Sequence, residues 1–185
     1  MSKAISNKNV ADAKFAPAPF DGPFKAALGR PELKGSWLIF GKSGSGKTTF
    51  ALQLAKYLTR FVDKVAFDSL EQGLSLSMQK AWKRVDMAAA GSKVIFLDKE
   101  SLPELRDRLS KRKSPNVIII DSVICLVGMR LADYQKLMND YPNKLFIFLA
   151  HEDDRGNPSP ALAEKIRKLS DIKMHVEGYK VFTTT

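Results

Sequence analysis

Residues 41–48 carry the pattern that most constrains this chain. They fit G-x-x-x-x-G-K-S/T without a mismatch, and this pattern is typical of a loop that binds phosphate. Its glycines let backbone N–H groups converge on an anion, while Lys47 is expected to reach the β- and γ-phosphates and Thr48 to ligate Mg²⁺. The helix after the loop offers its positive N-terminal end to the same anion. The predicted phosphate-binding residues are Gly41, Lys42, Ser43, Gly44, Ser45, Gly46, Lys47, Thr48 and Thr49.

A strand and a helix flank the loop in the required order. Residues 36–40 are a short apolar run, which is typical of a buried strand. Residues 49–58 have helical spacing, with Phe50, Leu54 and Tyr57 on one stripe. A glycine turn that matched by chance would seldom have these neighbours. The pattern and its context together predict a nucleotide site.

Strand and helix patterns alternate through the rest of the chain. Strands are predicted over residues 36–40, 64–68, 93–98, 116–121 and 145–150, and helices over 49–58, 74–85, 103–111, 132–139 and 161–169. Ser101 is a candidate N-cap, with Glu104 three residues later. Residues 171–176 and 179–183 predict a terminal β-hairpin that turns at 177–178. The alternation predicts an α/β fold with three layers, in which helices flank a mainly parallel sheet.

The first 33 residues differ in composition from the rest of the chain. They contain few periodic apolar residues and four prolines, which are Pro17, Pro19, Pro23 and Pro31. We predict an N-terminal arm over residues 1–33 that is partly disordered when alone, and a core over residues 34–185. The abrupt end at Thr185 leaves open that the chain is truncated.

Composition limits the setting and the partners. The 185 residues are 44% hydrophobic, enough for one domain with a core, and no run is long enough to span a membrane. The N-terminus lacks the apolar segment of a signal peptide, and the single Cys125 cannot form an internal disulfide. We therefore expect a cytoplasmic protein without a membrane role. A net charge of +10 favours a polyanionic partner, with nucleic acid first and an acidic membrane surface second, although an evenly solvated basic surface would give the same charge.

Asp121 ends four consecutive apolar residues, the expected form of a Walker B strand. A carboxylate at this position holds Mg²⁺, usually through water. The alternative is that Asp121 caps the next helix, a role that Ser122 could also fill. Two other apolar strands lie between the phosphate loop and Asp121. This count favours the branch of such proteins with a strand inserted between the two motifs and a separate catalytic glutamate.

Two segments resemble RecA. Residues 118–126, an apolar run followed by Asp-Ser-Val, resemble the Walker B segment of that family, and residues 65–74 resemble the strand that delivers its catalytic glutamate. The resemblance implies a RecA-like ATPase core over about residues 34–183, with ATP and Mg²⁺ as ligands. It implies that Glu71 polarises the attacking water. An ordinary solvated residue at a helix start is the alternative for Glu71.

The resemblance also implies roles for three residues after the fifth strand. His151 stands where RecA has a polar γ-phosphate sensor, typically Gln, so it departs from the family pattern. It could instead cap the strand without contacting a ligand. Lys165 and Arg167 resemble basic residues that RecA inserts into the ATP site of the neighbouring subunit. A solvated basic helix face is the alternative for these two.

The arm contains a Phe-x-x-Ala pattern at Phe15 and Ala18, which resembles the segment that RecA relatives dock onto the next subunit. The alternative is that its phenylalanines pack within the arm itself. The residues together predict an ATPase that forms a homo-oligomer on DNA, most readily single-stranded DNA, in recombination, annealing or replication. The small size resembles versions encoded by phages, which would place the protein in a host cytoplasm.

Two other functions remain open. One is a nucleotide-dependent switch or assembly factor with slow turnover and a protein partner. The other is a small-molecule kinase, which would need an arginine-rich lid, whereas the 152–160 loop has the single Arg155. That loop would be the DNA loop of RecA, but Glu152, Asp153 and Asp154 make its first half acidic.

Overall fold

A computed structural model describes residues 4–184 of the chain. The chain divides into two compact units, Met1–Glu32 and Leu33–Thr185. The first unit contains two short helices that the sequence did not predict, α1 (Asn7–Ala11) and α2 (Gly22–Leu28). Ser6 caps α1 by accepting a hydrogen bond from the Asn9 backbone at 3.2 Å. Both helices were missed because neither is long enough to show an apolar period.

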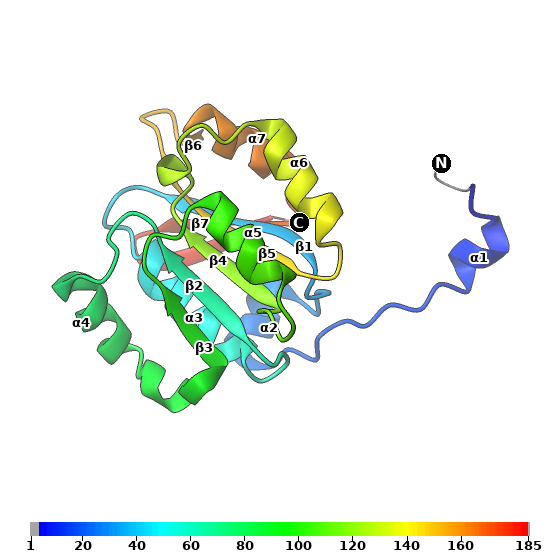
Figure 1. Ribbon diagram of the computed structural model, residues 1–185, viewed down its shortest axis with the longest axis horizontal. Helices are drawn as coiled ribbons and strands as arrows, with labels where there is room; N and C mark the ends of the chain where they lie inside the picture. Colours follow the sequence, from blue (N-terminus) through cyan, green and yellow to red (C-terminus); the bar gives the residue numbers. More distant parts are fainter. Residues whose placement is uncertain (1–3, 185) are drawn as a thin grey trace. The chain divides into compact units, whose positions relative to one another are not determined.

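The second unit is built on one eight-stranded sheet (Figure 1). Its strands are β1 (Gly35–Gly41), β2 (Val65–Ser69), β3 (Val94–Leu97), β4 (Val117–Asp121), β5 (Leu145–Glu152), β6 (Pro158–Ser159), β7 (Ile172–Glu177) and β8 (Lys180–Thr184). The order across the sheet is β3-β2-β4-β5-β1-β7-β8, and β6 pairs with the end of β5. In this order, each neighbouring pair from β3 through to β7 is parallel, while the β7–β8 hairpin and the β5–β6 pair are antiparallel. The predicted mainly parallel sheet with a terminal hairpin is confirmed.

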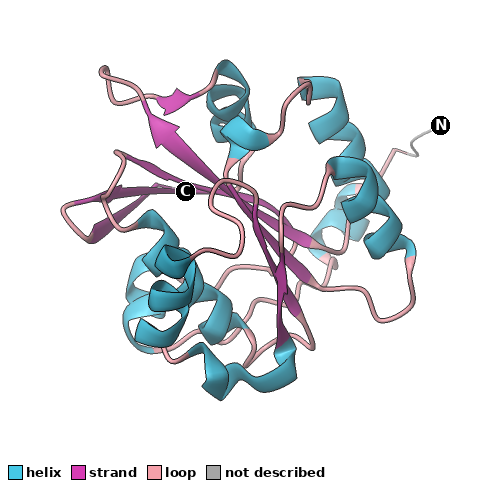
Figure 2. Cartoon of the chain, turned by 60° about the vertical axis from the view of Figure 1, so that its left-hand side comes forward, coloured by secondary structure: helices cyan, strands magenta, loops and turns pink. Residues whose placement is uncertain are grey.

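Helices cover both faces of the sheet and give the predicted three layers (Figures 1 and 2). The helices of this unit are α3 (Lys47–Leu58), α4 (Leu76–Arg84), η1 (Met87–Lys93), α5 (Leu102–Ser110), η2 (Val123–Cys125), α6 (Leu131–Asp140) and α7 (Ala161–Leu169). One core joins the sheet to α5, α6 and α7, with Leu105, Leu137 and Ile166 buried against strand residues such as Ile118 and Phe148. On α3, Ala51, Leu52, Leu54, Ala55 and Leu58 are buried completely.

Covering both faces explains why the central strands read as continuous apolar runs. Successive side chains of a strand point to opposite faces, so a strand covered on both sides needs apolar residues at every position. In β4, residues 117–120 are at most 1% exposed, and in β5 residues 145–150 are completely buried. These strands therefore show no alternation of apolar and polar residues.

The strand inserted between the two motif strands is β5. It pairs with β1 on one side and with β4 on the other, so Gly41 lies opposite His151 and Asp121 lies opposite Leu149. A strand is therefore inserted between the two motif strands, as expected. The prediction rested on the two strands that lie between the motifs in the sequence, β2 and β3, but the inserted strand is β5. This order brings the carboxyl ends of β1, β5, β4 and β2 into one row.

Some boundaries and short elements differ from prediction. Helix α4 begins at Leu76 rather than at residue 74, because the Ser75 hydroxyl accepts a hydrogen bond from the Met78 backbone at 3.1 Å and ends the preceding turn. The segments η1, η2 and β6 were not predicted. Within residues 4–184, no helix has both the length and the apolar content needed to cross a membrane.

Candidate nucleotide-binding site

The phosphate loop connects β1 to α3 and is held against the C-terminal hairpin. Gly46, which precedes α3, has a φ of 102°, a conformation that side chains disfavour. A Cβ at Gly46 would lie 2.9 Å from the ring of Tyr179, and a Cβ at Gly41 would lie 2.2 Å from the carbonyl oxygen of Val176. Both glycines are thus required by the close approach of the hairpin as well as by the turn.

Lys47 is folded back onto its own loop. Its ammonium group donates hydrogen bonds to the carbonyl oxygens of Gly41 at 3.0 Å and Lys42 at 2.8 Å. Burial lowers the pKa of Lys47, and the nearby carboxylates of Asp121, Glu71 and Glu152 partly oppose this shift. A buried cation close to a glycine-rich loop can exchange these carbonyl contacts for phosphate oxygens.

Asp121 and Thr48 place two oxygen groups side by side. The Thr48 hydroxyl donates a hydrogen bond to the Asp121 carboxylate at 2.8 Å. Asp121 is 3% exposed, and burial raises its pKa to about 6 despite the Thr48 hydrogen bond. Hard oxygen donors are what Mg²⁺ prefers, and a dication would offset the cost of burying this carboxylate. The residues present therefore fit a bound Mg²⁺.

Glu71 is fixed at the opposite side of Asp121. Its backbone N–H donates to the Asp121 carbonyl at 3.0 Å, which ties the connection after β2 to the end of β4. Its carboxylate accepts from the Ser122 hydroxyl at 3.1 Å and lies 2.9 Å from Nε2 of His151. Burial raises the pKa of Glu71, but the hydrogen bonds and charge of His151, the Ser122 hydrogen bond and Lys47 together lower it. The carboxylate is held in its ionised, acceptor form.

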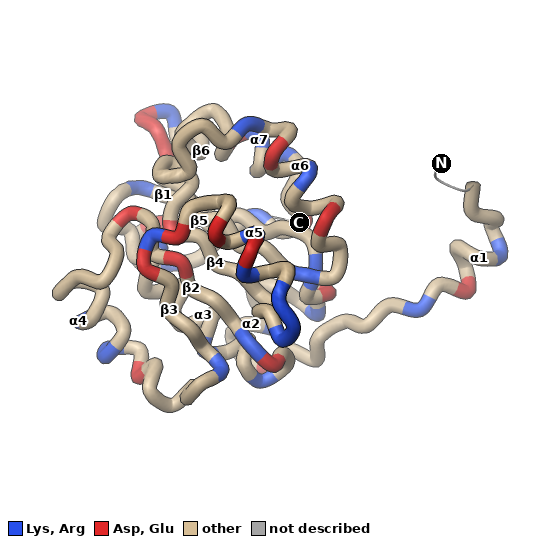
Figure 3. Tube along the Cα trace, in the orientation of Figure 1, with Lys and Arg blue, Asp and Glu red and all other residues tan. Residues whose placement is uncertain are grey.

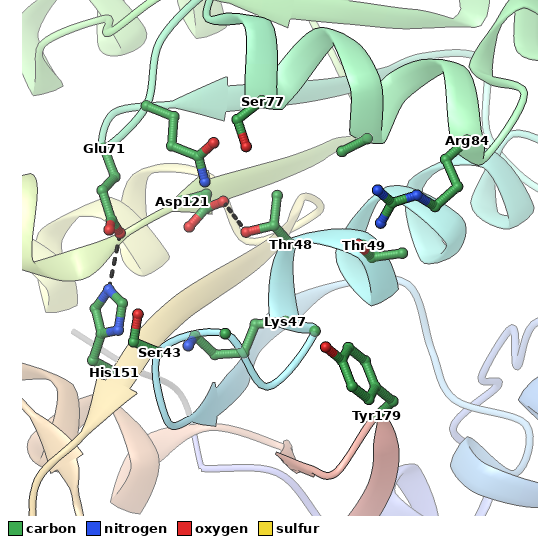
Figure 4. Close-up of a pocket in the computed structure, with 14 residues that line it drawn as sticks. Ser43, Lys47, Thr48, Thr49, Glu71, Ser77, Arg84, Asp121, His151 and Tyr179 are labelled. Atoms are coloured by element: carbon green, nitrogen blue, oxygen red, sulfur yellow. Dashed lines mark hydrogen bonds and ion pairs between the residues drawn. The ribbon is translucent and has the colours of Figure 1, made fainter.

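These groups line one cavity of about 260 Å³. Figure 4 shows Glu71 and His151 at one end, and Arg84 and Tyr179 at the other. Its lining residues are Ser43, Gly44, Gly46, Lys47, Thr48, Thr49, Glu71, Gln72, Ser77, Ala81, Arg84, Asp121, His151 and Tyr179. Of the predicted phosphate-binding residues, Gly41, Lys42 and Ser45 lie outside this lining.

The residues that α4 and the C-terminal hairpin contribute to the cavity were not predicted from the sequence. Ser77, Ala81 and Arg84 come from α4, and Tyr179 comes from the hairpin turn. The only available signal was Arg84 in the last turn of a helix with a weak apolar pattern. Tyr179 was assigned to a strand, with nothing in the chain to place it beside the phosphate loop.

Lys165 and Arg167 do not line this cavity. Both lie on α7, where Lys165 is exposed and the guanidinium of Arg167 contacts the Glu164 carboxylate at 2.8 Å. The structure therefore does not bring them to the site of their own chain.

The comparisons with known proteins agree with the fold. Residues 37–172 match the family described as "ATPase family associated with various cellular activities (AAA)". A stretch covering 51% of the chain is 31% identical to the DNA repair and recombination protein RadB of Methanosphaera stadtmanae, and covers 44% of that protein. The chain thus spans less than half of the RadB relative it matches.

Two solved structures share the fold. The flagellar accessory protein FlaH from Methanocaldococcus jannaschii has a TM-score of 0.63 and 15% identity, over 90% of this chain and 84% of that one. A KaiC-like protein from Pyrococcus horikoshii has a TM-score of 0.57 and 18% identity, over 92% of this chain and 85% of that one. The match over residues 37–172 shows that the chain belongs to the AAA ATPase family, and its sheet, with β5 between β1 and β4, has a RecA-like fold.

Proposed function

We propose that this chain hydrolyses ATP with Mg²⁺ and acts on DNA, most readily single-stranded DNA, in recombination, annealing or replication. The observation that carries the hydrolysis is the convergence of Lys47, the Thr48–Asp121 pair and the Glu71 carboxylate on one cavity. Lys47 and Thr48 begin α3 after β1, Asp121 ends β4, and Glu71 lies in the turn after β2, as expected for ligand sites at the carboxyl ends of strands in open α/β sheets.

The roles follow from the chemistry of each group. Lys47 would bind the β- and γ-phosphates, and Thr48 and Asp121 would hold Mg²⁺, which neutralises phosphate charge when bound. The ionised Glu71 would accept a hydrogen bond from the attacking water and orient it. Nε2 of His151 lies 2.9 Å from the Glu71 carboxylate. A γ-phosphate that hydrogen-bonded to His151 in place of Glu71 would therefore change the hydrogen bonding of Glu71, the proposed general base.

The far end of the cavity would hold the base of the nucleotide. Tyr179 offers a ring beside Gly46, and Arg84 offers a planar cation from α4. A purine could stack on either group. Neither residue forms part of a nucleotide motif, so this assignment rests on their place in the cavity alone.

The DNA partner is supported by two observations. The net charge is +10, and RadB, which the chain resembles over about half its length, is named as a DNA repair and recombination protein. The predicted DNA loop gives little support, since residues 153–156 form an acidic turn in which the Asp153 carboxylate accepts from the backbones of Arg155 and Asn157.

A homo-oligomer would complete the site. Lys165 and Arg167 lie away from their own cavity, so either could reach the γ-phosphate of a neighbouring subunit. Phe15 and Ala18 would dock the arm on that neighbour. Phe15 is 68% exposed, whereas Ala18 is buried. We place this assembly in the cytoplasm, or in the host cytoplasm if the gene belongs to a phage.

The experiment that tests this function is steady-state ATP hydrolysis with and without single-stranded DNA, with Lys47→Ala as the control. We expect DNA to raise the rate of the wild-type protein and to leave the variant inactive. Tight ATP binding with a rate of ATP hydrolysis that is the same with and without DNA would contradict the DNA-stimulated reaction. It would favour the nucleotide-dependent switch with a protein partner.

A further inference from the structure

The charges of the core are divided unequally between the two edges of the sheet. In the parallel part of the sheet, segments that leave strands lie at one edge, with the nucleotide cavity, and segments that enter strands lie at the other. The segments that leave strands carry four basic residues, Lys42, Lys99, Arg130 and Arg155, and five acidic residues, Glu71, Asp98, Glu100, Asp153 and Asp154. The segments that enter strands carry eight basic residues, Lys34, Arg60, Lys64, Lys93, Lys111, Arg112, Lys113 and Lys144, and three acidic residues, Asp63, Asp86 and Asp171. The positive excess therefore lies opposite the nucleotide cavity.

The densest part of this excess is the connection from α5 to β4. Lys111, Arg112 and Lys113 are consecutive there, and all three are exposed. In Figure 3, the connection after α5 is blue over this stretch. Lys111 lies 2.6 Å from Asp107, but both side chains are about two-thirds exposed, so water screens the pair. Three adjacent charges are thus presented to solvent by a short loop.

Hydrogen bonds fix the two neighbouring connections beside this loop. The Lys144 ammonium donates to the Ser114 hydroxyl at 2.9 Å and to the Pro115 carbonyl at 2.6 Å. Asn116 donates its backbone N–H to the Lys64 carbonyl at 2.9 Å, and its side-chain oxygen accepts from the Lys64 backbone at 3.2 Å. We name the surface formed by Lys64, Lys111, Arg112, Lys113 and Lys144 the basic edge.

The composition of the basic edge fits phosphates better than a lipid surface or bases. Within residues 4–184, the exposed large apolar side chains all lie outside the three connections that form it. A membrane-binding surface combines basic residues with apolar ones that enter the lipid. Base stacking requires exposed aromatic rings. Lysine and arginine alone contact the backbone, where they release counterions and read no sequence.

We propose that the basic edge binds the phosphate backbone of DNA, single-stranded and duplex alike. The proposal rests on the DNA function proposed above and places the DNA on the edge opposite the nucleotide cavity rather than on the acidic 152–160 loop. DNA and ATP then occupy separate edges of one sheet, so DNA bound there leaves the cavity open.

The test is DNA binding by the full chain, measured by fluorescence anisotropy with a labelled single-stranded oligonucleotide and a labelled duplex over a range of salt concentrations. The variant is Lys111→Gln with Arg112→Gln and Lys113→Gln, which removes three charges and keeps long side chains. Losing three phosphate contacts lowers the slope of log K against log salt by about 2 for single strands, which is roughly 100-fold in affinity at 0.1 M salt. ATP hydrolysis without DNA is expected to stay unchanged.

A matched control removes the same charge elsewhere. Lys80→Gln with Lys83→Gln and Lys136→Gln changes three exposed lysines on α4 and α6 and leaves the same net charge. We expect this control to keep the wild-type affinity within about threefold, because non-specific long-range attraction is screened at 0.1 M salt. Equal losses in both variants, or no loss in the first, would overturn the basic edge as the DNA site while leaving the DNA function intact.

Two further outcomes separate this inference from the function on which it rests. If the wild-type chain binds neither oligonucleotide at low salt, both the DNA function and the basic edge are refuted. If it binds phosphatidylserine vesicles through residues 111–113 and ignores DNA, the edge serves a membrane and the proposal is wrong. Folding of each variant is checked by its thermal transition, since a lowered transition would itself lower binding.

Discussion

Asp68 is a buried carboxyl group outside the nucleotide cavity. It is 1% exposed, and its side chain accepts a hydrogen bond from the Glu100 backbone at 3.2 Å. Burial raises its pKa to about 7, the Glu100 N–H opposes this, and the charges of Glu100 and Asp98 add to it. The folded protein therefore keeps a proton that the unfolded chain loses near pH 3.8.

The sign of the resulting pH effect is fixed by linkage. Between about pH 4 and pH 7 the native state binds more protons than the unfolded state, so the free energy of unfolding falls as the pH rises. We expect Asp68→Asn to remove this part of the decline and to stabilise the protein at pH 8 by a few kcal/mol relative to wild type, with no gain at pH 4. Urea unfolding at both pH values checks this, with the exposed Asp63→Asn as control. The prediction is refuted if the free energy of unfolding changes by the same amount between pH 4 and pH 8 in wild type and Asp68→Asn.

Tyr179 gives a second prediction at the level of one residue. Its φ of 62° is disfavoured for most side chains, and Asn tolerates this conformation well. We expect Tyr179→Asn to weaken ATP binding about tenfold through lost stacking, and to leave the binding of inorganic triphosphate unchanged. Calorimetric titration with both ligands measures the difference, and Tyr179→Phe, which keeps the ring, is the control. Equal losses for both ligands would place Tyr179 at the phosphates instead of the base.

At the level of elements, the N-terminal cap of α5 could be predicted from the sequence. Ser101 and Glu104 form the predicted capping box at the start of α5, with the Ser101 hydroxyl accepting from the Glu104 backbone. We expect Ser101→Ala to lower the free energy of unfolding by about 1 kcal/mol, because one N-terminal N–H group of the helix loses its acceptor. Chemical denaturation checks this value, and Ser101→Asp, which restores an acceptor, is expected to recover most of it. A Ser101→Ala variant as stable as wild type would mean that water replaces the cap at no cost.

The strands were predictable for a different reason. Each strand buried on both faces is a continuous run of apolar residues, as in residues 117–120. Segments such as α1, η1 and β6 have neither length nor period, so local sequence does not specify them.

The site shows the same division. Lys47, Thr48 and Asp121 were readable because each belongs to a motif whose spacing is local. Arg84 and Tyr179 line the same cavity, yet the first depends on the path of α4 and the second on the hairpin that packs against Gly46. Tertiary packing, which no local pattern records, places both. The roles of the site residues themselves stay predictions.

At the level of the whole molecule, the proposed assembly predicts complementation between inactive subunits. Lys47→Ala destroys the phosphate site and keeps α7, while the double variant Lys165→Ala with Arg167→Ala does the reverse. If α7 acts on the neighbouring site, a mixture of the two contains interfaces with an intact site and an intact donor. We expect such a mixture to recover measurable ATP hydrolysis, whereas each variant alone has little.

The control for this experiment is a mixture in which Phe15→Glu is added to both variants. If Phe15 docks the arm, the added charge prevents association and the recovery disappears. Full activity of the Lys165 and Arg167 variant on its own would instead show that α7 has no catalytic part. Sedimentation of each mixture reports whether an assembly is present.

In the proposed reaction, Glu71 activates water in a site where Lys47, Thr48 and Asp121 hold the nucleotide. The most direct measurement is single-turnover ATP hydrolysis by Glu71→Gln, together with the dissociation constant for ATP. The amide keeps an acceptor for Ser122 but is no longer a base, so hydrolysis is expected to slow by at least about 100-fold while ATP affinity stays within about threefold. Hydrolysis by Glu71→Gln at the wild-type rate, with ATP bound normally, would contradict the account.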